Sequence, residues 1–181
     1  MDRILKAGLV ILIIIGVLFF KGTQKKGPVA KAPNYGTFSF EQDLTLSGTP
    51  AAIYDAISGD ISGWWDHSFS EKPYKLFIEA KPGGGFYEIF DESGDGVLHA
   101  TVIAAQRGKM LRFVGPLGLA GNAVDLVCTY TFEPVLPDST KLRLSVHAAG
   151  EMHPDWPKAV EQVWQHFLLD QFKPYVEAGN R

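Results

Sequence analysis

The sequence is poor in several features that particular folds and activities require. It contains a single cysteine, Cys128, which excludes an internal disulfide framework and a cysteine-rich metal site. Its formal net charge is −3, so it has no electrostatic footprint for binding a nucleic acid. Charged residues make up only 20% and hydrophobic residues 46%, as in an ordinary globular protein. We therefore expect a folded domain with an apolar core, no nucleic-acid partner and no cofactor.

Motifs of several catalytic and binding classes are also missing. No G-x-S-x-G motif is present, and Cys128 has no evident histidine or asparagine partner in the sequence, so nucleophilic catalysis is not indicated. The five histidines include no H-E-x-x-H pair or other metal-ligand spacing. The glycine run 83–85 lacks the spacing of a phosphate-binding loop. The sequence thus predicts neither a metal site nor a phosphate site.

Residues 1–21 contain a long hydrophobic segment. An unbroken apolar run covers residues 7–20, with basic residues on both sides. The run extends to Ile4 if Lys6 reaches the membrane interface. As a helix it would then span roughly 25 Å, shorter than the ~30 Å hydrocarbon core, a deficit that flanking lysines can compensate. We interpret it as an N-terminal membrane anchor. A cleaved signal peptide is the alternative, but it needs a small-residue cleavage site, and residues 21–26, Lys-Gly-Thr-Gln-Lys-Lys, provide a poor one.

The sequence leaves open which side of the membrane holds the following domain. Lysines after the apolar run slightly outnumber the basic residues before it, which by the positive-inside rule favours the cytoplasm. A short basic tail before an apolar run is also how exported proteins begin, and on this ground we favour an extracytoplasmic domain. Residues 22–36 are rich in lysine, glycine and proline and are predicted to be a linker. The folded domain is expected to cover residues 37–178.

The pattern within this domain is that of short strands separated by turns. Runs of apolar and polar residues predict strands over residues 37–46, 74–80, 86–90, 97–105, 110–114, 124–132 and 142–148. Thr49 and Pro50 mark the start of a short helix, and a second short turn or helix is expected over residues 60–65. Strands at this spacing with short connections are typical of an antiparallel meander.

A long amphipathic helix is expected to close the chain. It begins near Asp155 and presents an apolar stripe at helical spacing, while Pro174 is expected to kink or end it near residues 170–173. This helix is the only predicted element long enough to cover the apolar face of the sheet. We therefore predict an α+β fold in which a curved antiparallel sheet of about six to seven strands wraps round a long C-terminal helix.

The order of several local motifs resembles a known family. They are Thr49-Pro-Ala-Ala-Ile-Tyr-Asp-Ala56, Trp64-Trp65, Pro82-Gly-Gly-Gly-Phe86, Gly96, Leu111 with Phe113, Gly115-Pro-Leu-Gly118, residues 140–147 and the closing helix. Over residues 38–176 this order resembles the helix-grip fold of the START and Bet v 1-like (SRPBCC) superfamily. The motifs are most similar to its branch related to the C-terminal domain of activator of Hsp90 ATPase and to polyketide cyclase-like proteins. The resemblance implies a cavity for small apolar or amphipathic molecules, but no single reaction.

We predict that this cavity lies between the sheet and the closing helix. Its expected lining is Trp65, Phe86, Leu126, Cys128, Tyr130, Phe132, Leu144, Trp164, Phe167 and Gln171. Gln171 falls within the apolar stripe, where it would orient the polar end of an otherwise apolar ligand. The glycine-rich loop 115–122 carries two leucines and is interpreted as a lid, a membrane-contacting edge or a packed loop.

Two other functions stay open at this point. An enzyme acting on a small cyclic or polyketide-like molecule would use Glu88 or His99 as general base. A buried Glu88 would have a raised pKa suited to that role, whereas a solvent-facing one would not. Both faces of the strand that holds His99 are apolar, so its direction is unresolved. A protein-interaction module of the Hsp90-activator type rests on resemblance alone, and no protein partner is identified.

Overall fold

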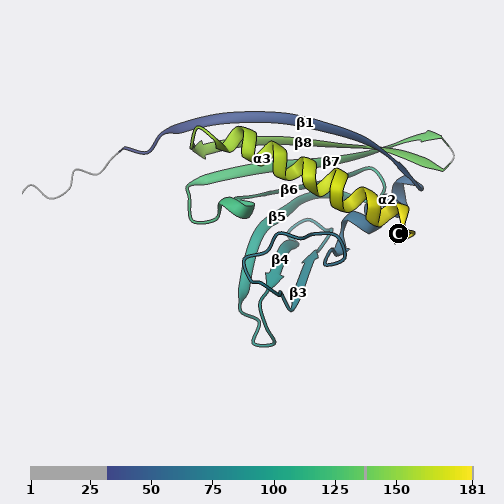
Figure 1. Ribbon diagram of the computed structural model, residues 1–181, viewed down its shortest axis with the longest axis horizontal. Helices are drawn as coiled ribbons and strands as arrows, with labels where there is room; N and C mark the ends of the chain where they lie inside the picture. Colours follow the sequence, from purple (N-terminus) through teal and green to yellow (C-terminus); the bar gives the residue numbers. More distant parts are fainter. Residues whose placement is uncertain (1–31, 137, 181) are drawn as a thin grey trace, which may run out of the picture. The chain divides into compact units, whose positions relative to one another are not determined.

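An eight-stranded antiparallel sheet forms the framework of the protein, which we describe from a computed structural model over residues 32–136 and 138–180 (Figure 1). The strands are β1 (Tyr35–Ser47), β2 (Gly59–Asp60), β3 (Lys75–Ile78), β4 (Gly85–Ile89), β5 (Gly96–Gln106), β6 (Met110–Gly115), β7 (Val124–Leu136) and β8 (Ser139–Glu151). Their order in the sheet is β1-β8-β7-β6-β5-β4-β3-β2. Strands β2 to β8 thus form the predicted meander, and β1 joins its edge by pairing with the last strand.

The predicted membrane anchor, residues 1–21, lies outside the described residues, as does most of the predicted linker 22–36. Within residues 32–136 and 138–180, no helix has the length and apolar character needed to cross a membrane. The anchor and the alternative of a cleaved signal both stay predictions.

The predicted strands are confirmed, and of the turn or helix predicted over residues 60–65 the structure shows the turn. That segment contains the end of β2 and a tight turn, in which the carbonyl of Ile61 accepts hydrogen bonds from the N–H groups of Trp64 and Trp65 at 3.2 and 2.9 Å. The two-residue strand β2 is also the strand that sequence periodicity did not predict, because two residues are too few to alternate. The other short helix, α2 (Pro50–Ile57), is capped as predicted by Thr49, whose hydroxyl accepts from the Ala52 N–H.

The C-terminal helix runs without a break across one face of the sheet (Figure 1). It consists of α3 (Trp156–Gln165), a π-helical segment η2 (His166–Phe172) and α4 (Lys173–Glu177). The expectation that Pro174 ends or kinks the helix near residues 170–173 is wrong in that the helix continues to Glu177. The π-helical segment shifts the hydrogen-bond register, since the Lys173 N–H donates to the Leu168 carbonyl. Pro174 follows directly after this register shift, in the first turn of α4.

The core lies between the sheet and the C-terminal helix. Alternate residues of β7 and β8 point into it and are at most 5% exposed: Val124, Leu126, Cys128, Tyr130, Phe132, Leu142, Leu144, Val146 and Ala148. Helix α2 packs its buried residues Ile53 and Ile57 against the same core. Trp64 is also buried and donates its indole N–H to the Ala56 carbonyl at 3.2 Å. The period-two pattern of the strands therefore did identify the inner face.

The Pro-Gly-Gly-Gly run attaches the β3–β4 turn to β5. Gly83 has φ 81°, a left-handed conformation that favours glycine, and a Cβ on Gly84 would lie 2.3 Å from the Glu79 carbonyl oxygen. Gly83 donates to the Val102 carbonyl, and Val102 donates to the Gly84 carbonyl. A register shift follows between Phe86 and Tyr87. Strand β4 leaves this turn with Phe86 and Glu88 both buried.

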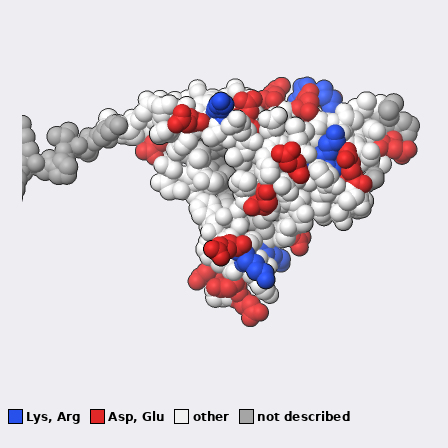
Figure 2. Space-filling model, in the orientation of Figure 1, with Lys and Arg blue, Asp and Glu red and all other residues white. Residues whose placement is uncertain are grey.

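Charged side chains are interspersed on the molecular face shown in Figure 2, where basic and acidic groups alternate along the upper edge. On β1 and β8, Asp43 forms ion pairs with Lys141 at 2.9 Å and with Arg143 at 2.7 Å. Hydrogen bonds from Arg143 and Lys141 hold the pKa of the Asp43 carboxyl far below its usual range. Acidic and basic side chains are thus interspersed on this part of the surface, which has no continuous basic character (Figure 2).

Candidate ligand cavity and adjoining polar cluster

An apolar cavity of about 560 Å³ lies beneath the first half of the C-terminal helix. Its walls come from that helix, from the loop 65–69, from the 3₁₀ segment η1 (Leu117–Leu119) and from inward residues of β5 and β7. The lining residues are Trp65, His67, Ser68, Phe69, His99, Pro116, Leu117, Gly118, Leu119, Leu126, Trp156, Ala159, Val160, Val163, Trp164 and Phe167. This volume falls within the range of roughly 300–1,000 Å³ that small-molecule sites occupy. Three polar side chains, His67, Ser68 and His99, interrupt the otherwise apolar wall.

Four of the ten predicted lining residues stand on this wall: Trp65, Leu126, Trp164 and Phe167. Phe86, Cys128, Tyr130, Phe132 and Leu144 do not, which corrects the prediction for those five. They are at most 4% exposed in the packed core. The reason is that the large side chains of the helix and of Trp65 fill the middle of the sheet. Trp164 lies 6.1 Å from the Tyr130 ring centroid, and Trp65 lies 5.0 Å from that of Phe86.

Gln171, the predicted polar group of the cavity, is not on its wall either. It lies in the π-helical segment, where its amide nitrogen is 3.4 Å from Nε2 of His166. The prediction used the 3.6-residue period of an α-helix, but a π-helical turn contains more residues, so side chains after His166 are rotated relative to that stripe. The polar groups that do face the cavity come from a loop and from β5.

The loop 115–122 contributes one side of the cavity through Pro116, Leu117, Gly118 and Leu119. Leu117 has φ 51°, a left-handed conformation that is unusual for a leucine, and it is only 7% exposed. Residues held in sparsely populated backbone conformations persist where the surroundings fix them, and they concentrate at functional sites. The structure thus places this loop on the cavity wall. Its roles as a lid or as a membrane-contacting edge stay predictions.

Glu88 and His99 form a buried hydrogen-bonded pair at the edge of the cavity. Glu88 is fully buried and accepts from the N–H groups of Phe69 and Ser70 at 2.9 and 2.7 Å, and from the Ser70 hydroxyl at 3.0 Å. Nε2 of His99 lies 3.0 Å from Oε2 of Glu88, the oxygen that also accepts from the Phe69 N–H. Of the two residues only His99 lines the cavity. The carboxylate therefore holds the loop 65–70 and orients the imidazole.

Glu88 is buried, but its pKa is lowered, which corrects the expectation that a buried Glu88 would have a raised pKa. Burial by itself raises the pKa of Glu88, but hydrogen bonds from the backbone of Phe69 and Ser70, the Ser70 hydroxyl and His99 together hold it below its ordinary value. Burial lowers the pKa of His99, and the attraction of Glu88 offsets only part of this effect. At neutral pH the pair is therefore a carboxylate and a neutral imidazole, and Glu88 lacks the raised pKa expected of a general base.

Replacing His99 with glutamine is expected to reduce the loss of stability between pH 7 and about 5.5. The folded-state pKa of His99 lies below its unfolded value, so its contribution is complete above the unfolded pKa of about 6.5 and decreases as pH falls. Glutamine can still donate to Glu88 but does not titrate. Urea unfolding of both proteins across this range measures the difference, and parallel pH profiles would contradict the assignment. The raised pKa of His166 makes its contribution to stability increase as pH falls. This contribution is the same in both proteins, so it does not affect the difference between their pH profiles.

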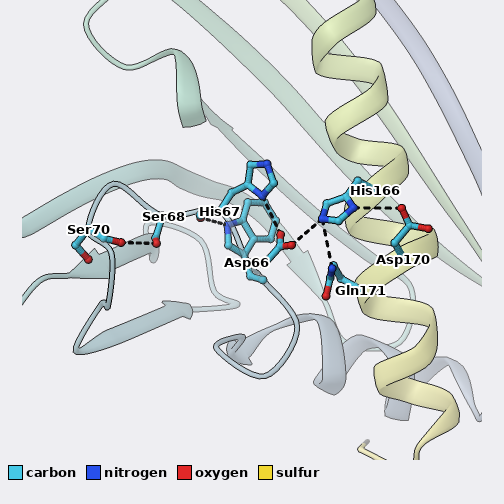
Figure 3. Close-up of polar contacts among 8 residues, drawn as sticks. Asp66, His67, Ser68, Ser70, His166, Asp170 and Gln171 are labelled. Atoms are coloured by element: carbon cyan, nitrogen blue, oxygen red, sulfur yellow. Dashed lines mark hydrogen bonds and ion pairs between the residues drawn. The ribbon is translucent and has the colours of Figure 1, made fainter.

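A second group of polar side chains adjoins the cavity (Figure 3). Asp66 lies between two histidines: Oδ1 is 2.8 Å from Nδ1 of His67, and Oδ2 is 2.7 Å from Nε2 of His166. The other ring nitrogen of His166 is 3.2 Å from the carboxylate of Asp170. Asp66, His67 and His166 place one metal-ligand atom each within 4.8 Å of one another. Sequence spacing did not predict this cluster, because 99 or more positions separate His166 from the other two.

Charge within this cluster shifts the pKa values of its members. Hydrogen bonding to Asp66 raises the pKa of His166 above its ordinary value, and Asp170 adds to this effect. Partial burial raises the pKa of Asp66, but its hydrogen bonds to His166 and His67 outweigh burial and lower the pKa overall. Asp66 is thus a carboxylate at neutral pH.

Comparison with solved structures identifies the architecture. A protein of unassigned function from Rhizobium leguminosarum superposes with a TM-score of 0.64 at 15% identity, covering 82% of this chain and 99% of the other. A protein of unknown function from Staphylococcus aureus gives 0.60 at 10% identity, covering 81% and 97%. Ara h 8.0201, a Bet v 1 homologue, gives 0.55 at 17% identity, covering 79% and 99%.

The fold is Bet v 1-like. At these identities the likeness establishes the fold alone, which agrees with the resemblance to the Bet v 1-like superfamily. No family model matches the chain, and no curated protein matches its sequence significantly. The branch related to the Hsp90 activator and to polyketide cyclase-like proteins is therefore not established. Within this Bet v 1-like fold, the pocket lies beneath the C-terminal helix and is bordered mainly by that helix, the loop 65–69 and η1.

Proposed function

We propose that the protein binds a small, mainly apolar molecule in the cavity beneath the C-terminal helix. The observation that carries this proposal is a pocket of about 560 Å³ that opens to the surface and has a mainly apolar and aromatic wall. Aromatic side chains such as Trp65, Trp164 and Phe167 offer large contact areas to a hydrophobic ligand. The Bet v 1-like fold of the chain supports binding as its function but does not identify the ligand.

The ligand is expected to have one polar end. His99 is a neutral imidazole on the wall, and Glu88 fixes the orientation of its ring through Nε2. Ser68, whose hydroxyl donates to the Ser70 carbonyl, lies on the same wall. A few well-placed polar groups among apolar ones are the usual means by which such pockets orient a ligand. An amphipathic molecule can contact the apolar part of the wall and also hydrogen-bond to its polar side chains.

Replacing Val163 with tryptophan is expected to prevent binding, because Val163 lines the cavity and the larger ring would fill it. Gln162→Trp is the matched control, since Gln162 is exposed on the same helix. Native mass spectrometry of the full-length proteins, purified from the organism that makes them, measures the outcome. Wild type and Gln162→Trp should carry a bound molecule that Val163→Trp lacks.

Two results would contradict the proposal. One is a wild-type spectrum that contains only the mass of the bare chain. The other is a bound molecule that Val163→Trp retains while its thermal unfolding matches that of the control.

The two alternative functions have less support. Catalysis by Glu88 required a raised pKa and access to the cavity, and Glu88 has neither. His99 reaches the cavity, but no substrate chemistry is indicated beside it. The protein-interaction function still rests on resemblance to the Hsp90 activators, and the comparisons do not establish that branch.

A further inference from the structure

The polar cluster beside the cavity has the composition of a transition-metal site. Two imidazoles and one carboxylate, His67, His166 and Asp66, are a ligand set that suits Zn²⁺ and related divalent ions. Four ligands at 2.0–2.1 Å in a tetrahedron lie about 3.3 Å apart. Nδ1 of His67 and Nε2 of His166 lie 2.8 and 2.7 Å from the two different oxygens of Asp66, and one ligand atom of each residue lies within 4.8 Å of the others. All three side chains are partly exposed, so they have room to adjust to the spacing that one ion requires.

Asp170 provides the support that a metal-binding histidine usually has. Its carboxylate lies 3.2 Å from Nδ1 of His166 and can accept the proton of that nitrogen. Nε2, which faces Asp66, is then the nitrogen that offers a lone pair. Histidine ligands typically donate their second N–H to a carboxylate in this way, which fixes the tautomer and the ring orientation. In Figure 3 the Asp66 side chain lies between the two rings, and Asp170 lies on the far side of His166.

Both elements that carry these ligands are held in place by the surrounding core. Trp65 donates its indole N–H to the His67 carbonyl at 2.7 Å and stacks on Phe167, the neighbour of His166, at 3.9 Å. Glu88 holds the same loop at Phe69 and Ser70. His166 is the first residue of the π-helical segment, a kind of irregularity that occurs frequently at functional sites. The loop and the helix are therefore fixed relative to each other close to the ligand atoms.

We propose that His67, His166 and the Asp66 carboxylate bind one divalent transition-metal ion, with Asp170 orienting His166. Three protein ligands leave a coordination position for water or another molecule. His67 also lines the cavity, so the ion lies at the cavity edge. The metal site rests on the contacts within the cluster and is independent of whether the cavity holds a ligand.

Calorimetric titration of the full-length chain with Zn²⁺ tests the proposal, using protein stripped of metal and free of any histidine tag. We expect saturation at one ion per chain. Asp170→Asn should weaken binding by about 10-fold or more, the usual effect of removing a carboxylate that orients a ligand. Asp66→Asn, His67→Gln and His166→Gln should each weaken it further. Zn²⁺ should also raise the unfolding temperature of the wild type but not of these three variants.

The control is His153→Gln, which removes an exposed histidine that lies 3.6 Å from the Asp155 carboxylate but outside the cluster. This variant should bind Zn²⁺ as the wild type does. Absence of saturable binding, or equal affinity in His166→Gln and the wild type, would overturn the proposal. So would a loss of binding in His153→Gln, since that would place the ion elsewhere. Urea unfolding of each variant without metal separates loss of the site from loss of the fold.

Discussion

Replacing Glu88 with alanine should lower the free energy of unfolding by about 3–5 kcal/mol, because several hydrogen-bond donors lose the buried carboxylate that accepts from them. The fully buried carboxylate accepts hydrogen bonds from two backbone N–H groups and the Ser70 hydroxyl, and it pairs with His99. Without it these partly buried donors lose their acceptor, and each donor left unpaired away from water costs about 1–3 kcal/mol. Urea denaturation with linear extrapolation measures the change.

Glu79→Ala is the matched control, because Glu79 is a glutamate whose ion pair with Lys81 is long, 3.7 Å, and exposed. It should change stability by no more than about 1 kcal/mol. If Glu88→Ala lost as little as this control, the carboxylate would not be holding the loop 65–70. Hydrogen exchange at Phe69 and Ser70 gives an independent check, since these amides should lose protection in Glu88→Ala.

Replacing Trp164 with alanine is expected to destabilise the protein by about 3–5 kcal/mol, the typical cost of truncating a buried large aromatic residue. Trp164 is 3% exposed, and its ring lies 5.7 Å from both Trp65 and Phe167 and 6.1 Å from Tyr130. Its loss would join the ligand cavity to a new void in the core. Thermal unfolding should shift downward by on the order of 10 °C.

Trp156→Ala provides the comparison for this variant. Trp156 lines the same cavity from the start of α3 but is only partly buried, and its aromatic neighbour is His153 at 6.4 Å. A smaller loss of stability is expected because fewer packed contacts disappear. Equal losses in the two variants would show that the aromatic cluster around Trp164 adds no stability beyond that of the cavity wall.

Some aromatic residues fill the core beside the cavity, and smaller residues border the cavity itself. Trp64 and Trp65 are adjacent, yet both face the C-terminal helix: Trp64 contacts Phe172 at 4.9 Å, and Trp65 stacks on Phe167. They can do so because they belong to a turn rather than to a helix. Trp65 and Trp164 close the space over the middle of the sheet, and the hollow remains where the smaller side chains of Ala159, Val160 and Val163 face the loop 116–119.

Much of the architecture was predictable from the sequence because it depends on local rules. The period-two pattern of β7 and β8 marks the buried face, Thr49 marks the start of α2, and the glycine run 83–85 marks a tight turn. An apolar stripe in the last helix predicted the element that covers the sheet. These signals use residues close in sequence, so they do not require knowledge of distant neighbours.

The site was less predictable, because its geometry depends on contacts between distant segments. Whether Glu88 is a solvent-facing residue or a buried anchor is decided by Phe69 and Ser70, which close over it from another loop. The π-helical segment alters the period that placed Gln171 in the cavity. Asp66 and His166 are brought to 2.7 Å only by packing of the loop against the helix.

The sequence by itself thus determined the order of elements, the inner face of the sheet and the α+β class, since side-chain periodicity follows directly from backbone geometry. Only the tertiary structure decided which inner residues border the cavity and which fill the core, because that depends on the volumes of side chains that meet across the sheet and the helix. It also decided the environment of Glu88 and the grouping of Asp66, His67 and His166. Such polar clusters arise where chain segments far apart in sequence pack together.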